Sequence, residues 1–351
     1  LKEDFLTQGK SVKNFEKLIS KKVNCKFCLT VNSASSALLL SCIASGLTKG
    51  DYAWTVPITY AATANSIIST GAEVDFVDIN SSTFNICTSS LKKKLSNTKK
   101  DKLPKVLIVV HLGGEPCDMK EIYKLSKKYK FKIIEDASHA LGSKYRSSKI
   151  GSCEYSESTV FSFHPVKTIT TGEGGCITTN SKKIFEYIHA IRSGGIIKEK
   201  KNLINKNLPS WYYEQHYLGF NLRLSDINAA LGLSQLKRLS SFESLRSKIR
   251  KRYVKHLQNL DLDIQITNKK NKTSNHLFII KVKKDRDKLF EFLKKNKIIC
   301  NLHYIPLYRH PFYKNKKIQI HKKFMKNSEE YFKNALSLPI HPLLKKNQQI
   351  K

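Results

Sequence analysis

The sequence predicts an α/β protein with a large, mixed but mostly parallel sheet in its first domain and a smaller α+β domain after it. Two observations predict this class. Apolar runs typical of strands, at residues 74–78 and 106–110, alternate with helical stretches such as residues 119–130, and this order produces parallel sheets covered by helices. From about residue 238 the composition changes to charged helices and short strands. We therefore expect the domains to comprise residues 1–237 and 238–351.

The net charge narrows the class of partner. The 351 residues carry 63 Lys and Arg against 28 Asp and Glu, a net charge of +35. The lysines are spread through the chain among Asn and Ile, without the arginine and aromatic interleaving that stacks bases. We interpret the charge as compositional bias and expect no nucleic-acid partner. Part of the charge still favours an anionic substrate such as a nucleotide diphosphate.

The apolar runs and the cysteines indicate the compartment. No apolar run approaches 18 residues and no signal peptide opens the chain, so we expect a cytoplasmic protein with no membrane partner. The eight cysteines lie in contexts typical of reduced thiols, and Cys25-x-x-Cys28 lacks the second pair of ligands that zinc needs, so we predict no metal site. The chain begins at Leu1 without Met, and we expect a missing N-terminal segment.

In chain order, the first elements are an amphipathic helix and a strand that enters a second helix. Residues 11–21 predict the first helix, with one apolar face formed by Val12, Phe15, Leu18 and Ile19. Residues 28–31 predict the strand, and small hydroxyl residues at 33–36 begin the second helix. Free N–H groups at such a helix start can bind phosphate, although a serine there also fits an ordinary N-cap.

Two residues further along are candidates for contact with an aromatic cofactor. Tyr60 lies where the loop at 56–65 enters a helix, a position that fits stacking on a ring as well as plain packing. Asp136 follows the buried strand that ends around Ile133 and Ile134, so it lies at the carboxyl edge where open α/β sheets bind ligands. Taken alone, Asp136 also fits a helix N-cap or a metal ligand.

The stretch 158–180 holds a single lysine between two strands. Residues 158–163 and 175–179 predict the strands, and the polar, glycine-rich loop between them carries Lys167. A lysine that snorkels to solvent is the ordinary interpretation of such a loop. Together with Asp136, however, a desolvated lysine suits pyridoxal phosphate, because the carboxylate keeps the pyridine nitrogen protonated and the amine holds the aldehyde.

The remaining chain predicts a helix at about 182–192, a lysine-rich aromatic loop, and a long helix that Ser225 caps. A strand follows within residues 275–282. Two short stretches with polar and aromatic residues, at 303–306 and 337–341, are candidates for the border of a cleft.

Six of these stretches occur together in the order of a known family. They are residues 32–38, 59–63, 135–140, 162–167, 172–175 and 220–224. The chain resembles the DegT/StrS family of pyridoxal-phosphate sugar aminotransferases over residues 6 to about 343. The resemblance implies fold type I of the pyridoxal-phosphate transferases, which is the fold of aspartate aminotransferase. Residues 6–10, 168–171, 230–237 and 274–277 are most similar to the members that aminate UDP-4-keto sugars of the pseudaminic acid pathway.

The resemblance implies a role for each matching residue. Lys167 is similar to the family's Schiff-base lysine, Asp136 to the partner of the pyridine nitrogen, and His139 to the residue beside the phenolic oxygen. The other implied cofactor contacts are Tyr60 on the ring and Ala34, Ser35, Ser162 and Asn221 at the phosphate. The implied substrate contacts are Arg223, His303 and Tyr304.

The resemblance also implies partners and leaves alternatives. Asn221 matches a residue that reaches the cofactor of the other subunit, which implies a homodimer with shared active sites. The implied reaction moves the amino group of L-glutamate to carbon 4 of a UDP-4-keto-6-deoxy-N-acetylhexosamine. Another keto position or nucleotide is the first alternative, and a non-catalytic protein that binds pyridoxal phosphate or nucleic acid is a remote one. A subgroup with His in place of the lysine dehydrates sugars, and Lys167 argues against it.

Overall fold

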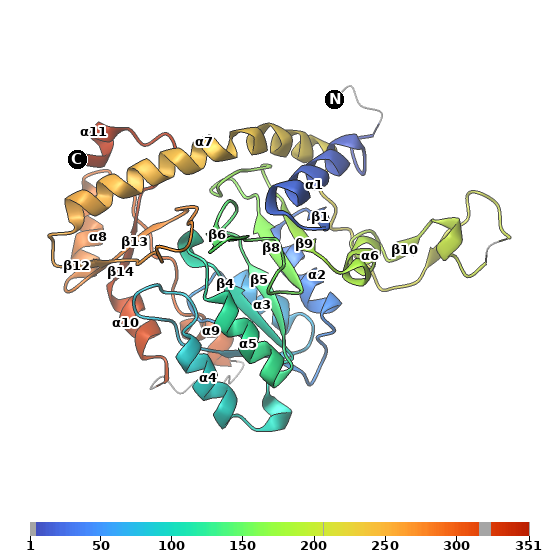
Figure 1. The fold of residues 1–351 in the computed structure, drawn as a ribbon, viewed down its shortest axis with the longest axis horizontal. Coiled ribbons are helices and arrows are strands. Elements are labelled where there is room, and N and C mark those ends of the chain that lie inside the picture. The colour runs from blue at the N-terminus through green and yellow to red at the C-terminus, as the bar shows by residue number, and fades with distance from the viewer. Residues whose placement is uncertain (1–4, 206, 316–323, 351) are drawn as a thin grey trace.

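The computed structural model describes residues 5–205, 207–315 and 324–350, and its central feature is a sheet of seven strands in the order β1-β9-β8-β5-β4-β2-β3 (Figure 1). The strands are β1 (Phe27–Val31), β2 (Tyr52–Thr55), β3 (Glu73–Phe76), β4 (Val106–Val110), β5 (Lys132–Asp136), β8 (Ser158–Ser162) and β9 (Gly175–Thr179). Strand β9 is antiparallel to both neighbours, and the other pairs in the sheet are parallel. The predicted mixed, mostly parallel sheet is therefore confirmed.

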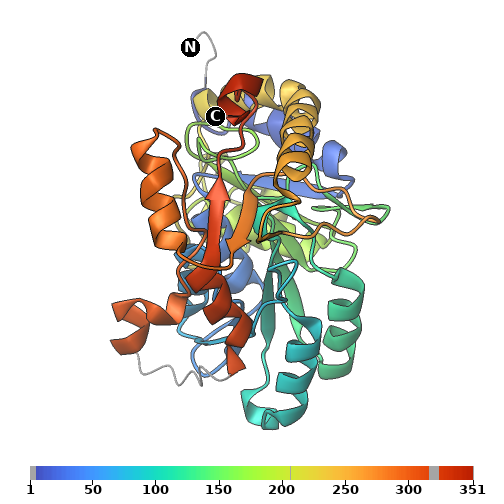
Figure 2. The same cartoon turned by 90° about the vertical axis from the view of Figure 1, so that its left-hand side faces the viewer.

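Helices cover both faces of this sheet (Figure 2). Along β4, Val106 and Ile108 belong to one apolar core, whereas Leu107 and Val109 belong to another, because successive residues of a strand face opposite sides. The first core includes residues of α2 (Ala34–Ala44), α3 (Ala61–Ile68) and α6 (Lys182–Ile191). The second core includes residues of α1 (Lys10–Val23), α4 (Thr88–Asn97), α5 (Met119–Tyr129) and α7 (Asp226–Leu257).

The ends of several helices follow from local sequence. Ser33, Ser181 and Ser225 each accept a backbone N–H of the first turn of α2, α6 and α7, as N-cap residues do. The predicted cap at Ser225 is thus confirmed. The apolar face predicted for α1 was wrong at Leu18, which is 41% exposed. The buried residues of α1 are spaced three or four apart, and Leu18 is rotated out of that stripe.

A second, smaller sheet lies at the far end of α7 (Figure 1). It is antiparallel, with the order β12 (Leu262–Ile264), β13 (Phe278–Val282) and β14 (Ala335–Leu338), and shares a core with the C-terminal half of α7. The helices near it in the chain are α8 (Arg286–Lys295), α9 (Pro311–Asn315), α10 (Lys326–Asn334) and α11 (Lys346–Ile350). Helix α7 runs unbroken through residues 237 and 238, and the division of the chain there stays a prediction.

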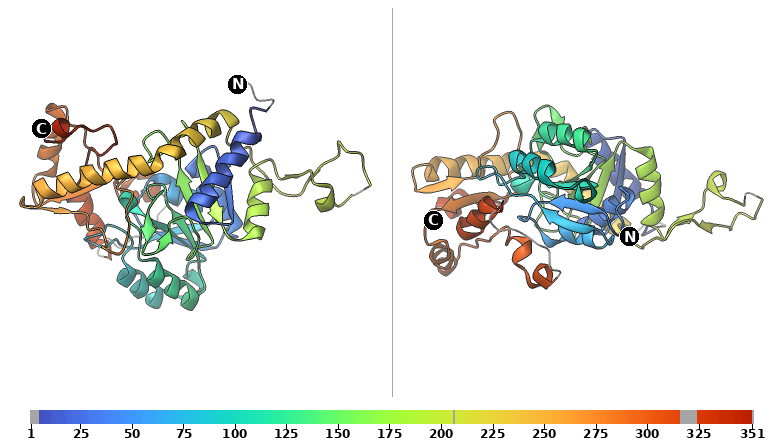
Figure 3. Two further views of the ribbon diagram at one scale, coloured as in Figure 1. Left: turned by 45° about the horizontal axis from the view of Figure 1, so that its top comes forward. Right: turned by 90° about the horizontal axis from the view of Figure 1, so that it is seen from below.

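One segment projects away from the rest of the molecule (Figure 3). This arm, residues 196–205 and 207–220, contains the short pair β10 (Ile196–Ile197) and β11 (Glu214–Gln215). At its base a Cβ on Gly195, where φ is +72°, would lie 1.9 Å from the Tyr217 carbonyl oxygen. A Cβ on Gly219 would lie 1.9 Å from the Gly195 nitrogen, so the two glycines allow the segments to cross. A second short pair joins β6 (Lys144–Tyr145) to β7 (Ser148–Lys149).

Within the described ranges, every helix is too short or too polar to span a bilayer. The same ranges contain no group of three or more His, Cys, Asp or Glu side chains arranged to hold a metal ion.

Candidate active site

Asp136 lies at the carboxyl end of β5, and the chain around it holds both oxygens of its carboxylate. The residue is 5% exposed. Its Oδ1 accepts the Ser138 hydroxyl at 2.6 Å and the Ser138 backbone N–H at 3.2 Å. Its Oδ2 accepts the Thr63 hydroxyl at 2.8 Å. The orientation of the carboxylate is therefore set from two sides, by its own loop and by α3.

Lys167 lies in the loop between β8 and β9, as predicted, and it is partly buried. Its backbone N–H donates to the His164 carbonyl at 2.9 Å, which makes this part of the loop a tight turn. Burial lowers the pKa of the Lys167 amine to about 8, and the Asp136 carboxylate acts in the opposite direction. An amine with this pKa is half neutral near pH 8, and only the neutral amine attacks a carbonyl.

His139 follows Asp136 and is held in one tautomer. The Gly113 backbone N–H donates to its Nδ1 at 3.3 Å, so the ring hydrogen is on Nε2, which lies 3.3 Å from the Tyr304 hydroxyl. Burial lowers the pKa of His139 well below its ordinary value, and the Lys167 charge adds to this. His139 is thus a neutral N–H donor.

The charge of Lys167 acts on two more histidines, His276 and His303. The ring of His276 is 4.4 Å from that of His139, and its Nδ1 is buried without a hydrogen-bond partner among the described residues. His303 Nδ1 lies 2.9 Å from the Ser337 hydroxyl, and burial with the Lys167 charge lowers the pKa of His303 to about 4. Burial and the Lys167 charge lower the pKa of His276 as well, so all three histidines favour the neutral form.

Aromatic rings border the same space. Tyr60 immediately precedes α3 and is 63% exposed. Its ring centroid is 6.2 Å from that of Tyr304, whose ring stacks at 6.3 Å over His139. The structure therefore brings together six of the predicted residues, and these are Tyr60, Asp136, His139, Lys167, His303 and Tyr304.

The start of α2 forms a separate corner with β8 and β9. The backbone N–H groups of Ala34 and Ser35 have no acceptor among the described residues, as expected in the first turn of a helix. Gly175 pairs with Ser162 across β8 and β9, and a Cβ on Gly175 would lie 2.6 Å from the Ala34 nitrogen. The corner therefore combines free N–H groups, two serines and a glycine that leaves room beside them, which suits a phosphate.

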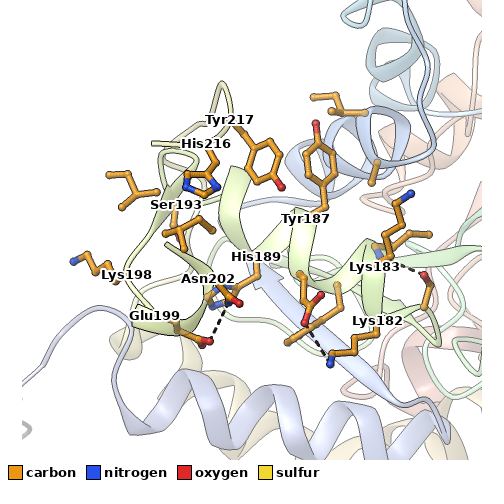
Figure 4. A pocket seen from close by; sticks show the side chains of 18 of the residues that line it. Lys182, Lys183, Tyr187, His189, Ser193, Lys198, Glu199, Asn202, His216 and Tyr217 are labelled. Atoms are coloured by element: carbon orange, nitrogen blue, oxygen red, sulfur yellow. Dashed lines mark hydrogen bonds and ion pairs between the residues drawn. The ribbon is translucent and has the colours of Figure 1, made fainter. Parts of the chain in front are cut away.

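Asn221 and Arg223 lie elsewhere, along the other edge of β1. Asn221 bridges to Ser193 and is exposed, whereas Arg223 bridges to Val31. Arg223 lines an open groove that runs along α6 to the base of the arm, with Lys182, Tyr187 and His216 among its other lining residues (Figure 4). The roles predicted for these two residues stay predictions.

The residues present fit pyridoxal phosphate. A buried carboxylate, a partly desolvated amine and a neutral imidazole N–H lie together, and an anion-binding corner is built into the same sheet edge. These are the groups that the ring nitrogen, the aldehyde, the phenolic oxygen and the phosphate require.

Comparisons with known proteins decide the family. The model of the DegT/DnrJ/EryC1/StrS aminotransferase family matches residues 1–351. The chain belongs to this family. It is therefore a sugar aminotransferase that depends on pyridoxal phosphate, with the α/β fold that the sequence predicted.

Individual relatives and solved structures agree with this family assignment. The aminotransferase is 38% identical to UDP-4-amino-4,6-dideoxy-N-acetyl-beta-L-altrosamine transaminase of Campylobacter jejuni, over 97% of this chain and 87% of the relative. PseC of Helicobacter pylori, an aminotransferase of pseudoaminic acid biosynthesis, superposes with a TM-score of 0.89 at 30% identity, over 99% of this chain and 90% of PseC. The putative sugar aminotransferase Spr1654 of Streptococcus pneumoniae, in its PMP-form, has a TM-score of 0.90 at 26% identity over 99% and 91%.

Sequence reasoning missed Thr63, Ser138 and His276. All three lie inside stretches that matched the family, but none was singled out. Thr59 and Thr63 are four residues apart at a helix start, which indicates that their hydroxyls share a face. The contact of His276 with His139 joins residues 137 positions apart, and no local pattern indicates it.

Proposed function

We propose that the aminotransferase moves the amino group of L-glutamate to carbon 4 of UDP-2-acetamido-2,6-dideoxy-β-L-arabino-hex-4-ulose. The products are 2-oxoglutarate and a UDP-4-amino-4,6-dideoxy sugar. The observation that carries the proposal is the cluster of Lys167, Asp136 and His139 in a chain whose relatives are named for this amination.

In this proposal Lys167 transfers the proton between the reacting atoms. When bound, pyridoxal phosphate supplies an aldehyde that carries nitrogen and a ring that withdraws electrons. The Lys167 amine, with its pKa near 8, holds the aldehyde at rest and afterwards accepts and returns a proton at Nζ. Asp136 offers a carboxylate oxygen to the pyridine nitrogen, and His139 offers its Nε2–H to the phenolic oxygen.

The remaining predicted residues bind and orient. The Ala34 N–H, Ser35 and Ser162 hold the phosphate, and the exposed ring of Tyr60 covers the pyridine. His303 and Tyr304, which lie beside Lys167 and His139, contact the sugar.

The half-reaction with glutamate tests the aminotransferase roles. Purified protein saturated with pyridoxal phosphate receives L-glutamate alone, and the denatured sample is then analysed by mass spectrometry. We expect pyridoxamine phosphate and 2-oxoglutarate in equal amounts. Protein that retains its pyridoxal phosphate unchanged contradicts the proposed donor.

A panel of keto sugars tests the acceptor. The pyridoxamine form receives the UDP-4-keto sugar, the corresponding GDP- and dTDP-linked 4-keto sugars, and a 3-keto sugar. We expect kcat/KM to be highest for the UDP-4-keto sugar. A higher value for another nucleotide or keto position supports the alternative that the enzyme serves a different nucleotide-sugar pathway.

We also propose that two copies share their active sites. The arm exposes large apolar side chains, with Leu218 83%, Ile204 79% and Trp211 74% exposed, and the exposed Asn221 follows the arm directly. Apolar groups exposed at this level are typical of surfaces that a partner covers. In the proposed dimer, Asn221 of one copy reaches the phosphate corner of the other.

Mixed dimers test this sharing. The variants Lys167→Ala and Asn221→Ala are each expected to be nearly inactive. If one site takes Lys167 from one copy and Asn221 from the other, dissociating and reassociating an equal mixture restores about a quarter of wild-type activity, since half of the dimers hold one intact site. No recovery in mixed dimers contradicts shared sites.

We also propose that the enzyme is located in the cytoplasm. The eight cysteines are all free thiols, which supports a reducing compartment.

A further inference from the structure

A buried hydroxyl chain reaches Asp136 from the side opposite its own loop. Thr63, in the first turn of α3, has a fully buried side chain, and its hydroxyl donates to Asp136 Oδ2 at 2.8 Å. The Thr59 hydroxyl lies 2.8 Å from that of Thr63 and is also buried. No other group of the described residues donates a hydrogen bond to Oδ2, so Thr63 is the one donor that orients this oxygen.

Hydrogen-bond counting gives the chain a direction. A hydroxyl has one hydrogen to donate, and an ionised carboxylate only accepts. The Thr63 hydroxyl donates its one hydrogen to Asp136. At the 2.8 Å contact between the two hydroxyls, Thr59 is therefore the donor and Thr63 the acceptor. Each donor in such a series polarises the next, which strengthens the last bond, the one to the carboxylate.

Helix α3 joins this chain to the rest of the site. Tyr60, which borders the cofactor space, precedes the helix by one residue. Pro57, just before the helix, and Asn65, within it, are hydrogen-bonded to the C-terminal part of the chain. The Pro57 carbonyl accepts the Leu307 N–H at 3.0 Å, and Asn65 Oδ1 accepts the Tyr313 hydroxyl at 3.0 Å. Thr63 is therefore held on a fixed element between the ring-covering residue and the carboxylate.

We propose that Thr63, supported by Thr59, is a positioning residue that holds the Asp136 carboxylate aimed at the pyridine nitrogen of pyridoxal phosphate. The inference rests on the proposed role of Asp136 and adds a residue that acts through it. Thr63 touches the carboxylate and does not itself touch substrate. Its effect is on how strongly the apoenzyme binds the cofactor and on whether the ring nitrogen is protonated.

Three variants test the inference. Thr63→Val keeps the shape and removes the donor, whereas Thr63→Ser keeps the donor. Thr55→Val is a matched control, because Thr55 is equally buried and its hydroxyl donates at 2.9 Å to the Ile108 carbonyl rather than to Asp136. The readouts are the Kd of the apoenzyme for pyridoxal phosphate and the ¹⁵N chemical shift of the bound pyridine nitrogen, neither of which depends on turnover.

We expect Thr63→Val to weaken binding of pyridoxal phosphate by about tenfold to 100-fold, as for loss of a hydrogen bond to a charged group, and to move the ¹⁵N shift toward that of the unprotonated ring. Thr63→Ser returns both values to within about threefold of wild type. Thr55→Val leaves both unchanged even if it lowers Tm. A Thr63→Val enzyme with the wild-type Kd and ¹⁵N shift overturns the inference, as does failure of Thr63→Ser to restore them.

Three further outcomes can be told apart. If Thr63→Val does not fold, Thr59→Val takes its place, with the same direction of change expected at smaller size, and no change in the ¹⁵N shift then overturns the inference. If wild-type apoenzyme fails to bind pyridoxal phosphate, the proposed function fails. If the wild type binds it and transaminates while the Thr63 variants match it, only the role of Thr63 fails.

Discussion

The sheet edge around Asp136 and the projecting arm are built on opposite principles. At the sheet edge the polar groups are buried and contact one another, as the Ser138 and Thr63 donors do with Asp136. In the arm, large apolar side chains such as Trp211 and Leu218 are exposed, and the two-residue strands β10 and β11 supply its regular structure. One chain thus brings Lys167, Asp136 and His139 together by itself, whereas the arm keeps apolar surface that we expect a second copy to cover.

The largest expected effect is a loss of activity that leaves the dimer intact. Lys167→Ala removes the only amine of the described residues shown to be coupled to Asp136, and we expect kcat to fall by about 10³-fold or more. The arm is untouched, so the dimer should persist. Stopped-flow assays and light scattering measure the two. An active variant that still holds its cofactor covalently contradicts the role of Lys167.

The second prediction changes a residue of the arm and leaves the active site unchanged. Leu218→Asp places a charge on a side chain that is 83% exposed in one chain, and we expect dimer dissociation to increase by about 30-fold or more if a partner buries it. Activity should fall at low protein concentration and recover at high concentration. Sedimentation measures the first effect, and dilution assays the second.

Lys200→Asp is the matched control, since Lys200 is exposed, charged and in the same arm. It is expected to behave as wild type. Equal effects of both variants point to net charge rather than to apolar docking.

A third prediction uses pH at the reactive centre. The neutral Lys167 amine captures the aldehyde, so the rate of covalent capture by apoenzyme, trapped with borohydride and measured by mass, should rise through pH about 8. Asp136→Asn removes the carboxylate that raises the pKa of Lys167, and the midpoint should move to lower pH. A midpoint unchanged by Asp136→Asn contradicts the coupling of the two groups.

The same shift affects stability. The pKa of Lys167 is about 8 in the folded chain against an ordinary value of 10.5, so the unfolded chain binds more protons between these values. Its contribution to the free energy of unfolding therefore rises with pH across that window.

The smallest effect is expected inside the arm. Three hydrogen bonds lower the pKa of Glu214 to about 2. The largest effect comes from the Asn205 N–H, followed by the His216 side chain and the Ile204 N–H. Glu214→Gln should loosen the arm and weaken dimerisation severalfold at most, with kcat of the dimer unchanged. Because the depressed pKa keeps Glu214 ionised at neutral pH, its contribution should be constant from about pH 5 upward and be lost only toward pH 2. Hydrogen exchange of the arm measures the change, and a drop in dimer kcat would contradict it.

Much of this molecule is predictable from local patterns. Strands β4 and β9 have the predicted bounds, since runs of apolar or β-branched residues bounded by turns define buried strands. Asp136 and Lys167 were found because a strand end and a glycine-rich loop are visible in one dimension. The direction of β9, antiparallel within a parallel sheet, was not predicted, because pairing depends on contacts far apart in the chain.

Contacts between distant segments explain the rest. Thr63 supports Asp136 across 73 positions, and the ring of His276 packs at a tilt against that of His139 because the segment between α7 and β13 returns to the large sheet. The buried side of α1 was missed at Leu18 because only its packing against a neighbour decides which residues of a wide apolar stripe face inward. The role predicted for Asn221 involves a second chain and that of Arg223 a bound substrate, and both stay predictions.

Helix α7 has a mechanical consequence. Its 32 residues make a rod of about 48 Å that starts five residues after Asn221 and ends beside the sheet whose strand β14 contacts His303 through Ser337. A rod of that length turns a tilt of about 5° into a displacement of about 4 Å at its far end. The helix is thus a lever that joins the segment after Asn221 to the C-terminal sheet, so a small tilt at one end becomes a displacement of several ångströms at the other.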